Sequence, residues 1–295
     1  MNRRYPQLPS TSAAISMAAG QPPGEPLPSG APVLRRSLCS LAQPVLKQAR
    51  QMPRFLFHEA TVLFVMAGRL DLDDGVNRLS VGAQEALLLI DPESCLDVRK
   101  APESPELPFR SVFLSFPAAL LETFHRHHAA SKPSGSGNPW ACRQVPLDTD
   151  LAETLRGVMD GVQASRVSDE RLAHRLMDFL LALAERGHAF TDAGQRGTAG
   201  RLRALLGEAP DRHWTARAAG QALAMSEATL RRRLASENVR FEALLVDIRM
   251  HHAMMLLQTT PWSIPRIAQA CGYQSRARFT DRFRLRFGYL PSAVR

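Results

Sequence analysis

Apolar and polar residues follow two different rhythms along this chain, and the change of rhythm separates a strand-rich part from a helical part. Between residues 41 and 116, short apolar runs are divided by turn signals roughly every 8–12 residues, which is typical of a small β-barrel or jelly roll. Asp73-Asp74-Gly75 predicts a hairpin turn. The strands that we expect are Thr61–Met66, Leu70–Leu72, Val76–Leu79, Ala86–Ile90, Cys95–Arg99 and Phe109–Phe116.

After residue 116 the apolar spacing changes to the helical period of about 3.6. Helices are predicted at Ala118–His128, Thr149–Gln163 and Ser168–Arg186, with a Gly/Ser-rich loop at residues 131–139. One face of the third helix is apolar, and the sequence leaves open whether this stripe packs inside the domain or forms a dimer seam. The stripe consists of Leu172, Leu176, Phe179, Leu180 and Leu183.

Two segments without apolar periodicity mark the domain boundaries. Residues 1–32 are rich in Pro, Ser, Ala and Gly and predict a disordered leader. Residues 187–200 predict a glycine-containing linker. The expected fold class is therefore α+β, with a β-rich domain and flanking helices at 33–186 and an all-α domain at 201–295.

The all-α domain contains two predicted helix-turn-helix units joined by a long helix, Phe241–Gln258. The first unit spans Ala218–Ala224, a turn at Met225, and Ser226–Glu237, and the second spans Ser263–Pro291 with a break at Gly272. Thr215, Ser263 and Ser275 are the expected helix caps. The last helix has two opposite stripes, one of Phe279, Phe283 and Phe287, and an outward one of Arg276, Arg278, Arg282, Arg284 and Arg286.

Charge is concentrated in the same domain. The chain has a net charge of +9, and residues 199–295 account for all of it with 16 Arg, no Lys and 7 acidic residues. Residues 1–198 are balanced, with 21 basic and 21 acidic residues. A basic, all-arginine surface beside two helix-turn-helix units indicates a phosphate-backbone partner, namely double-stranded DNA.

The second helix-turn-helix resembles that of the AraC/XylS family of bacterial transcription regulators. Ten positions carry the resemblance: Ile264, Ile267, Ala268, Gly272, Tyr273, Ser275, Phe279, Phe283, Gly288 and Pro291. The first unit and the linker helix match less fully, through Met225, Ser226, Thr229, Leu230, Arg233, Leu234, Arg249 and Ala253. Ala219, Gly220 and Asn238 depart from the family pattern. Asn238 is a mild change because asparagine tolerates the left-handed conformation, but the first two weaken the core, so the first subdomain is expected to be the less stable one.

The resemblance implies a sequence-specific regulator, with activation as the expected sign, and a cupin-like N-terminal domain that senses a signal or mediates dimerisation. The partners that it implies are promoter DNA in the major groove, RNA polymerase, a small-molecule or protein effector, and a second copy of the chain.

The two recognition helices should lie about one DNA turn apart, roughly 34 Å, on a stiff connecting helix. Asp281 has two open interpretations. In the functional one it accepts from a cytosine amine or orients a neighbouring arginine, and in the other it forms a surface ion pair with Arg278 or Arg284. The DNA-facing candidates are Glu227, Ala228, Arg231 and Arg232 in the first unit, and Arg276, Ala277, Arg278, Thr280, Asp281 and Arg282 in the second.

The alternative function is a metal-dependent cupin-type enzyme with a DNA-binding appendage. Such an enzyme needs several ligands on neighbouring strands, and the strand region has one histidine, His58. We therefore predict no metal, no cofactor and no catalytic residues. The other paired histidines are expected at the surface: His125, His127 and His128 at a helix end, and His251 and His252 on the linker helix.

Four well-separated cysteines, Cys39, Cys95, Cys142 and Cys271, fit neither a zinc motif nor a disulfide framework. No apolar run approaches the ~18 residues of a membrane span, and the N-terminus has no apolar stretch typical of a signal peptide. The sequence thus predicts a protein of the reducing cytoplasm.

Overall fold

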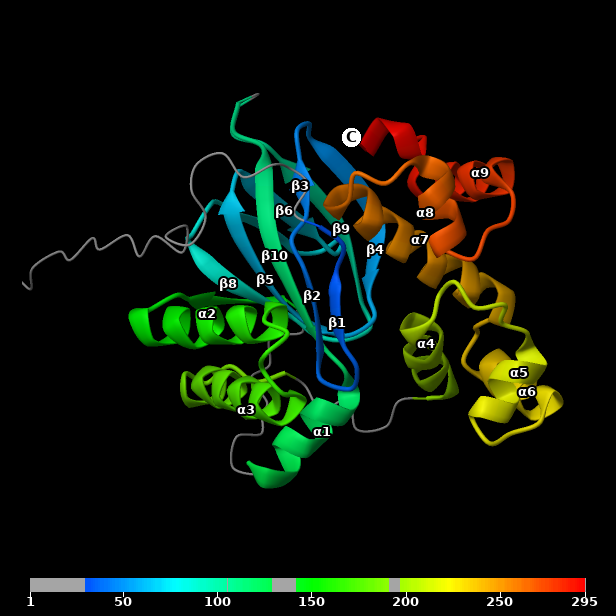
Figure 1. Ribbon diagram of the computed structural model, residues 1–295, viewed down its shortest axis with the longest axis horizontal. Helices are drawn as coiled ribbons and strands as arrows, with labels where there is room; N and C mark the ends of the chain where they lie inside the picture. Colours follow the sequence, from blue (N-terminus) through cyan, green and yellow to red (C-terminus); the bar gives the residue numbers. More distant parts are fainter. Residues whose placement is uncertain (1–29, 105, 129–141, 191–196, 295) are drawn as a thin grey trace, which may run out of the picture.

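The computed structural model describes residues 30–104, 106–128, 142–190 and 197–294. The predicted leader, apart from its last three residues, and the predicted loop at 131–139 lie outside the described residues. Figure 1 shows a β-rich domain with helices α1–α3 on one side and helices α4–α9 on the other, which confirms the α+β class.

The β-rich domain consists of two antiparallel sheets. The larger has the strand order β1 (Val33–Arg35), β2 (Cys39–Ala42), β10 (Phe109–Phe116), β5 (Ala60–Ala67), β8 (Ala86–Ile90) and β11 (Cys142–Pro146), with β3 (Val45–Leu46) also paired to β10. The smaller has the order β4 (Arg50–Phe57), β9 (Ser94–Ala101), β6 (Arg69–Asp73) and β7 (Arg78–Val81).

Most predicted strands are present, and β8 and β10 have the predicted bounds. The predicted strand Val76–Leu79 is displaced, because Val76 is 89% exposed in a longer turn. One carboxylate oxygen of Asp74 accepts hydrogen bonds from the backbone N–H groups of both Val76 and Asn77, and this stabilises the turn. Strand pairing therefore resumes only at Arg78, opposite Asp73.

The larger sheet is buried on both faces, which explains the uninterrupted apolar runs of its central strands. In β8, Leu88 and Ile90 pack between the two sheets, whereas Leu87 and Leu89 pack under the helices. The same alternation holds in β5 and β10. The sheet is thus the middle layer of the domain.

Helices α1 (Ala118–His127), α2 (Thr149–Gln163) and α3 (Asp169–Glu185) cover the outer face of this sheet. The five apolar residues of the α3 stripe are at most 3% exposed and belong to that core. The stripe therefore packs within the domain, and it does not form a dimer seam. His125, expected at the surface, is 6% exposed, so that expectation was wrong for this residue.

The C-terminal domain is entirely helical. It contains α4 (Thr198–Glu208), α5 (Ala216–Ala222), α6 (Glu227–Ser236), α7 (Phe241–Thr259), α8 (Ile264–Ala270), α9 (Arg276–Phe287) and the 3₁₀ turn η2 (Pro291–Val294). Helix α4 begins inside the predicted linker, because the Glu237 carboxylate accepts from the N–H groups of Thr198 and Ala199 and caps the helix from another element.

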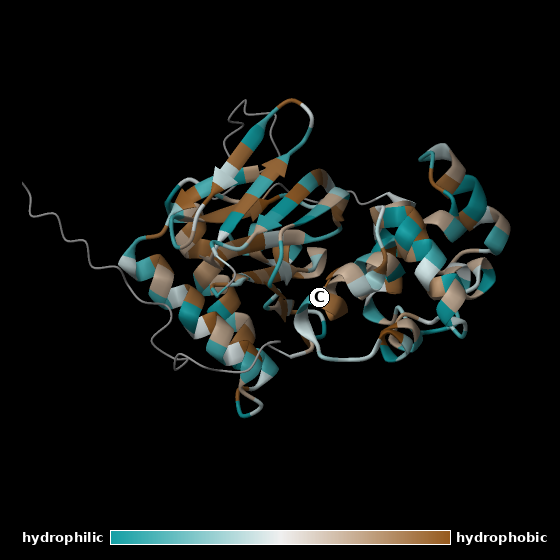
Figure 2. Cartoon of the chain, turned by 90° about the horizontal axis from the view of Figure 1, so that it is seen from above, coloured by the Kyte–Doolittle hydropathy of each residue, from teal (hydrophilic) through white to brown (hydrophobic). Residues whose placement is uncertain are grey.

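The predicted caps are confirmed. The side chains of Thr215, Ser263 and Ser275 each accept a hydrogen bond from a backbone N–H in the first turn of the following helix. Asn238 has φ 56°, the left-handed conformation that asparagine tolerates, and it follows the end of α6. Figure 2 shows that hydrophilic residues are frequent on the helices of this domain.

Candidate nucleic-acid interface

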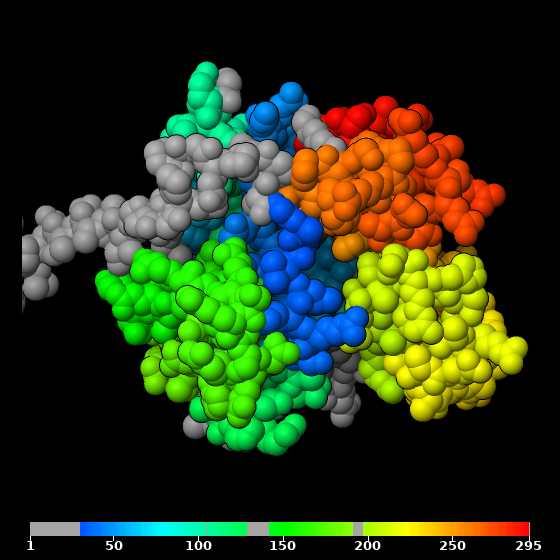
Figure 3. Space-filling view, viewed as in Figure 1, coloured from blue at the N-terminus to red at the C-terminus, as the bar shows by residue number. Residues whose placement is uncertain are grey.

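The N-terminal turns of α6 and α9, one in each helix-turn-helix unit, reach solvent. Both begin directly after a capping serine, Ser226 or Ser275. In Figure 3 the lobes that contain α6 and α9 lie on the side of the molecule opposite α2 and α3. Eight of the ten predicted DNA-facing residues are exposed at these turns or one turn further on: Ala228, Arg231, Arg232, Arg276, Ala277, Arg278, Asp281 and Arg282.

Two candidates of the first unit, Glu227 and Arg231, are engaged with each other. The Arg231 guanidinium forms ion pairs with Glu227 at 2.9 Å and with Glu242 of α7 at 3.0 Å. These two carboxylates raise the pKa of Arg231 above its usual range. Arg231 therefore links α6 to α7 at the surface, and Arg232 beside it is exposed without an ion pair among the described residues.

In the second unit, Thr280 is half-buried and Asp281 is exposed. Among the residues that the structure describes, Asp281 forms no ion pair with Arg278 or Arg284, so the predicted surface salt bridge is not formed. The interpretation of Asp281 as a base-contacting residue stays a prediction.

A shared aromatic core holds α9 in place. Phe279 and Phe283 are 0% exposed and Phe287 is 2% exposed, with successive ring centroids 6.0 and 4.7 Å apart. This confirms the predicted phenylalanine stripe. The core fixes the azimuth of α9, and thereby the side of the helix that Arg276 and Arg278 occupy.

Arg249 of α7 links the two helix-turn-helix units. Its guanidinium donates to the carbonyl oxygens of Pro210 and Arg212, each at 3.0 Å, in the turn before α5. Gly272, in the turn of the second unit, lies against it with φ 75°, and a Cβ there would come within 2.6 Å of Arg249 Nη2. The turn needs glycine both for its φ and for this close approach.

Arg286 is an exception to the predicted outward stripe, because it points to the N-terminal domain. Its Nε donates to Asp247 Oδ1 at 2.7 Å, and its two Nη atoms donate to the carbonyl oxygens of Pro53 at 3.0 Å and Arg54 at 2.6 Å. Those two residues form a bulge in β4, where Arg54 has φ 49°. The bulge exposes carbonyl groups that regular pairing would occupy.

His251 is also placed differently from the prediction: it is 7% exposed and lies in the contact between the domains. Its Nδ1 is 3.3 Å from His58 Nε2, and the backbone N–H of Leu56 lies 3.4 Å from its Nε2. Burial lowers the pKa of His58 and of His251 to about 3, so both imidazoles are neutral at pH 7. His58 thus faces α7, and the described residues do not assemble a cupin-type ligand set on neighbouring strands.

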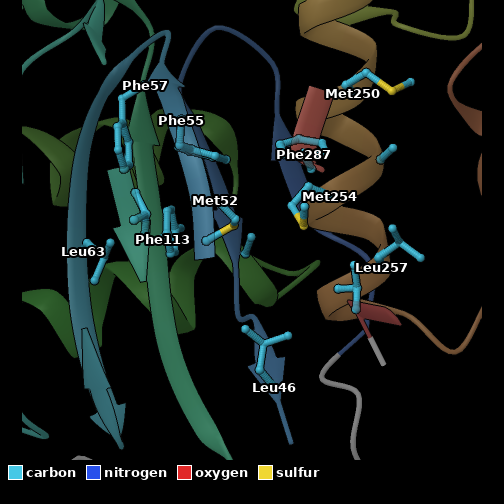
Figure 4. Packing of buried hydrophobic residues seen from close by; sticks show 14 of the residues in the cluster. Leu46, Met52, Phe55, Phe57, Leu63, Phe113, Met250, Met254, Leu257 and Phe287 are labelled. Carbon is cyan, nitrogen blue, oxygen red and sulfur yellow. The ribbon is translucent and has the colours of Figure 1, made fainter. Parts of the chain in front are cut away.

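An apolar contact surrounds these polar groups, and the two domains share one core. Figure 4 shows Met250, Met254 and Leu257 of α7 beside Met52 and Phe55 of β4, which all belong to one cluster of buried side chains. The contact continues in two further polar interactions: the Arg203–Glu93 ion pair, and the hydrogen bond that Tyr289 Oη donates to the backbone carbonyl of Gln51.

Lys100 of β9 is the most unusual residue at this contact. Its Nζ is buried 4.5 Å from the centroid of the Phe113 ring and donates at 2.8 Å to Gln258 Oε1 of α7. In the described part of the chain no carboxylate pairs with it. Burial lowers the pKa of Lys100 to about 7. Sequence reasoning missed this residue, because a single lysine in a strand has no distinguishing pattern.

The four cysteines are free thiols, as predicted. Burial raises the pKa of Cys39, Cys142 and Cys271 to about 12, which makes them unreactive at pH 7. Among the described residues no helix is both long enough and apolar enough to cross a bilayer.

Comparison with known proteins agrees with this geometry. A family model described as a helix-turn-helix domain matches residues 219–295. The chain is 29% identical over 145 residues to the HTH-type transcriptional regulator YdeO of Escherichia coli K12, covering 47% of this chain and 57% of that protein. It is 35% identical over 91 residues to the urease operon transcriptional activator of Escherichia coli, covering 31% of each. The matched regions thus span about half or less of these relatives.

A solved structure has the same fold over most of the chain. Wild-type ToxT from Vibrio cholerae with bound unsaturated fatty acid superimposes with a TM-score of 0.58 at 14% identity, covering 88% of this chain and 96% of ToxT. At that identity the similarity establishes the fold, which comprises both domains. Residues 219–295 thus form a helix-turn-helix domain of the AraC type, which confirms the resemblance seen in the sequence.

Proposed function

We propose that this chain is a sequence-specific DNA-binding regulator of transcription in which α6 and α9 enter successive major grooves. The observation that carries the proposal is that two serine-capped helix starts, each with exposed arginine, are both fixed to α7. The N-terminal residues of a recognition helix contact base edges, and an arginine that binds a guanine bidentately contributes about 1–3 kcal/mol of discrimination.

Within this proposal the exposed residues have separate roles. Arg232 and Arg276 read bases, because they are exposed near the two helix starts. Arg278 and Arg282 lie further along α9 and contact base edges or phosphates, and Asp281 accepts from a cytosine amine. Arg231 acts indirectly, since Glu227 and Glu242 hold it.

The test is a comparison of affinity for the chain's own upstream region and for a scrambled duplex of equal length at the same salt concentration. We expect preference for the upstream region and expect Arg276→Ala to reduce the preference roughly 5- to 150-fold, the equivalent of 1–3 kcal/mol. Arg284→Ala is the matched control: this exposed arginine lies two turns later on α9, and its loss should weaken both duplexes equally. Equal affinity of the wild-type protein for both duplexes would contradict the proposal.

The N-terminal domain is proposed to bind an effector that carries a carboxylate. Lys100 is buried beside two phenylalanine rings and has only an amide oxygen as its polar partner among the described residues. An anionic head group would supply the missing counter-charge, and an apolar tail would suit the surrounding core. ToxT, which has this fold, was solved with a bound fatty acid.

Thermal shift with a series of straight-chain monocarboxylates tests this part. The wild-type melting temperature should rise with ligand concentration, and Lys100→Met should abolish the rise. An equal rise in both proteins would show that the lysine does not bind the head group.

The proposal also includes activation, contact with RNA polymerase, action as a pair of chains and a cytoplasmic location. The urease operon relative, which is named as an activator, supports the sign. A promoter fusion measured with and without the gene would decide it: higher expression without the gene would indicate repression.

A further inference from the structure

Three metal-ligating side chains from two domains meet at the interdomain contact. His58 follows β4, whereas Asp247 and His251 lie one turn apart on α7. His58 Nε2 is 3.3 Å from His251 Nδ1 and 4.0 Å from Asp247 Oδ2, and His251 Nδ1 is 3.5 Å from Asp247 Oδ2. The three ligand atoms thus form a compact triangle.

We propose that His58, Asp247 and His251 form a site for a divalent transition-metal ion of the zinc type, which ties the linker helix to the N-terminal domain. Zinc bonds to imidazole nitrogen and carboxylate oxygen at about 2.0–2.2 Å, so two ligands at a tetrahedral angle lie about 3.4 Å apart. Two edges of the observed triangle match this spacing, and the third is wider by about half an ångström. Two imidazoles and one carboxylate, with a position left for water, are a common ligand set for such ions.

Asp247 is oriented as a ligand. Its Oδ1 accepts from Arg286 Nε at 2.7 Å, which leaves Oδ2 facing the two histidines. A partner that holds the non-ligating oxygen is the usual outer-shell support of a metal-binding carboxylate. The arginine is itself fixed by the β4 bulge through the carbonyls of Pro53 and Arg54, so the support also spans both domains.

His251 has to exchange contacts when the ion binds. In the structure, His251 Nε2 lies 3.4 Å from the Leu56 backbone nitrogen and 3.3 Å from Arg286 Nη2, both of which are donors. Metal ligation through Nδ1 would place the ring proton on Nε2, so Nε2 could no longer accept from them. Both distances exceed the usual 2.7–3.2 Å range, so these are weak hydrogen bonds whose loss is small beside the three metal–ligand bonds that form.

The competing explanation is a hydrogen bond between the two histidines, which the same 3.3 Å distance permits. The two explanations differ in what zinc does. A metal site binds one ion and requires His58, whereas a hydrogen-bonded pair leaves zinc unbound or bound elsewhere on the chain.

The test is titration of the full-length, chelator-stripped protein with zinc alone, in competition with a chromophoric chelator. We expect one ion per chain and at least about 100-fold weaker binding in His58→Ala, since even outer-shell residues contribute 10- to 100-fold. His252→Ala is the matched control: this half-buried residue is next on α7 but outside the cluster, and its loss should change the affinity less than about two-fold.

A second control separates this site from surface binding. His127→Ala removes an exposed imidazole on α1 and should leave zinc binding intact. Absence of binding, unchanged binding in His58→Ala, or loss of binding in His127→Ala would each overturn the proposal.

Asp247→Asn provides a second variant in case His58→Ala does not fold, as judged by circular dichroism. It keeps the side-chain volume and should lower the affinity, and with cobalt(II) in place of zinc it should lose the visible bands of a four-coordinate complex. Unchanged bands would exclude the site. None of these measurements involves DNA, so they remain informative if the proposed function is wrong.

Discussion

Replacing Lys100 with methionine should stabilise the protein, and the gain should depend on pH. Lys100 is 2% exposed and its amine is held by one amide oxygen and two aromatic rings. Methionine has a similar length without the amine, so it should fill the same space between β9 and α7.

The magnitude follows from the pKa. Burial lowers the pKa of Lys100 from 10.5 to about 7, so the unfolded chain binds this proton more tightly than the folded chain does. The destabilisation is fully present below pH 7 and disappears as the pH rises through 10.5. At 1.36 kcal/mol per pKa unit it amounts to about 4 kcal/mol at pH 7 and about 2 kcal/mol at pH 9. The variant also leaves Gln258 Oε1 without its donor, at a pH-independent cost of about 1–3 kcal/mol.

Urea unfolding of both proteins at pH 7 and pH 9 measures the effect. We expect Lys100→Met to be more stable by about 1–3 kcal/mol at pH 7, and expect this advantage to fall by about 2 kcal/mol at pH 9. Other titrating groups are common to both proteins and cancel in the difference. The exposed Lys47→Met is the matched control and should track the wild type at both pH values. Parallel curves for wild type and Lys100→Met would refute the reasoning.

Two further predictions concern α7 and its surroundings. Gly272→Ala should destabilise the C-terminal domain by about 2 kcal/mol or more, because the backbone has a φ of 75° and the added Cβ meets Arg249. Gly288→Ala, where a Cβ has open space around it, should cost only about 1 kcal/mol. Equal costs of the two variants in urea unfolding would show that the contact between Gly272 and Arg249 does not require glycine. Met254→Ala should lower the free energy of unfolding by about 2–5 kcal/mol, because the residue is 1% exposed in the shared core, whereas Met255→Ala, at a partly buried residue, should cost clearly less. If Met254→Ala separated the two domains without lowering stability, that result would argue against the shared core.

The local elements could be predicted because their signals are local. The five-residue run of β8 and the spaced leucines of α2 predicted both elements with their observed bounds. Strand β4 was missed because Pro53 and Arg54 interrupt its alternation, and the structure shows a bulge there. Strand β11 was missed because it is short and is defined as a strand by its pairing with β8, a contact that the sequence does not show.

The interdomain site could not be predicted in the same way. His58 and His251 are 193 positions apart, and each alone has the appearance of an ordinary polar residue at the end of a strand or on a helix. A signal was nevertheless present in α7: apolar residues occur on every side of its C-terminal half, and a helix that is apolar all round is buried all round. The sequence therefore implied that α7 packs against a second surface, but it did not identify that surface.

The position of α7 links the two parts of the proposed function. Its N-terminal half packs in the core of the first helix-turn-helix unit, through Phe241, Leu244 and Ile248. Its C-terminal half packs at once against α9 and against the β-rich domain, through Met250 and Met254. The proposed ligand at Lys100 and the proposed ion at His251 would therefore act on the same helix, the one that connects the two helix-turn-helix units. Because packed cores change between discrete arrangements and do not deform smoothly, a shift of α7 against β4 would move α6 and α9 together relative to the β-rich domain.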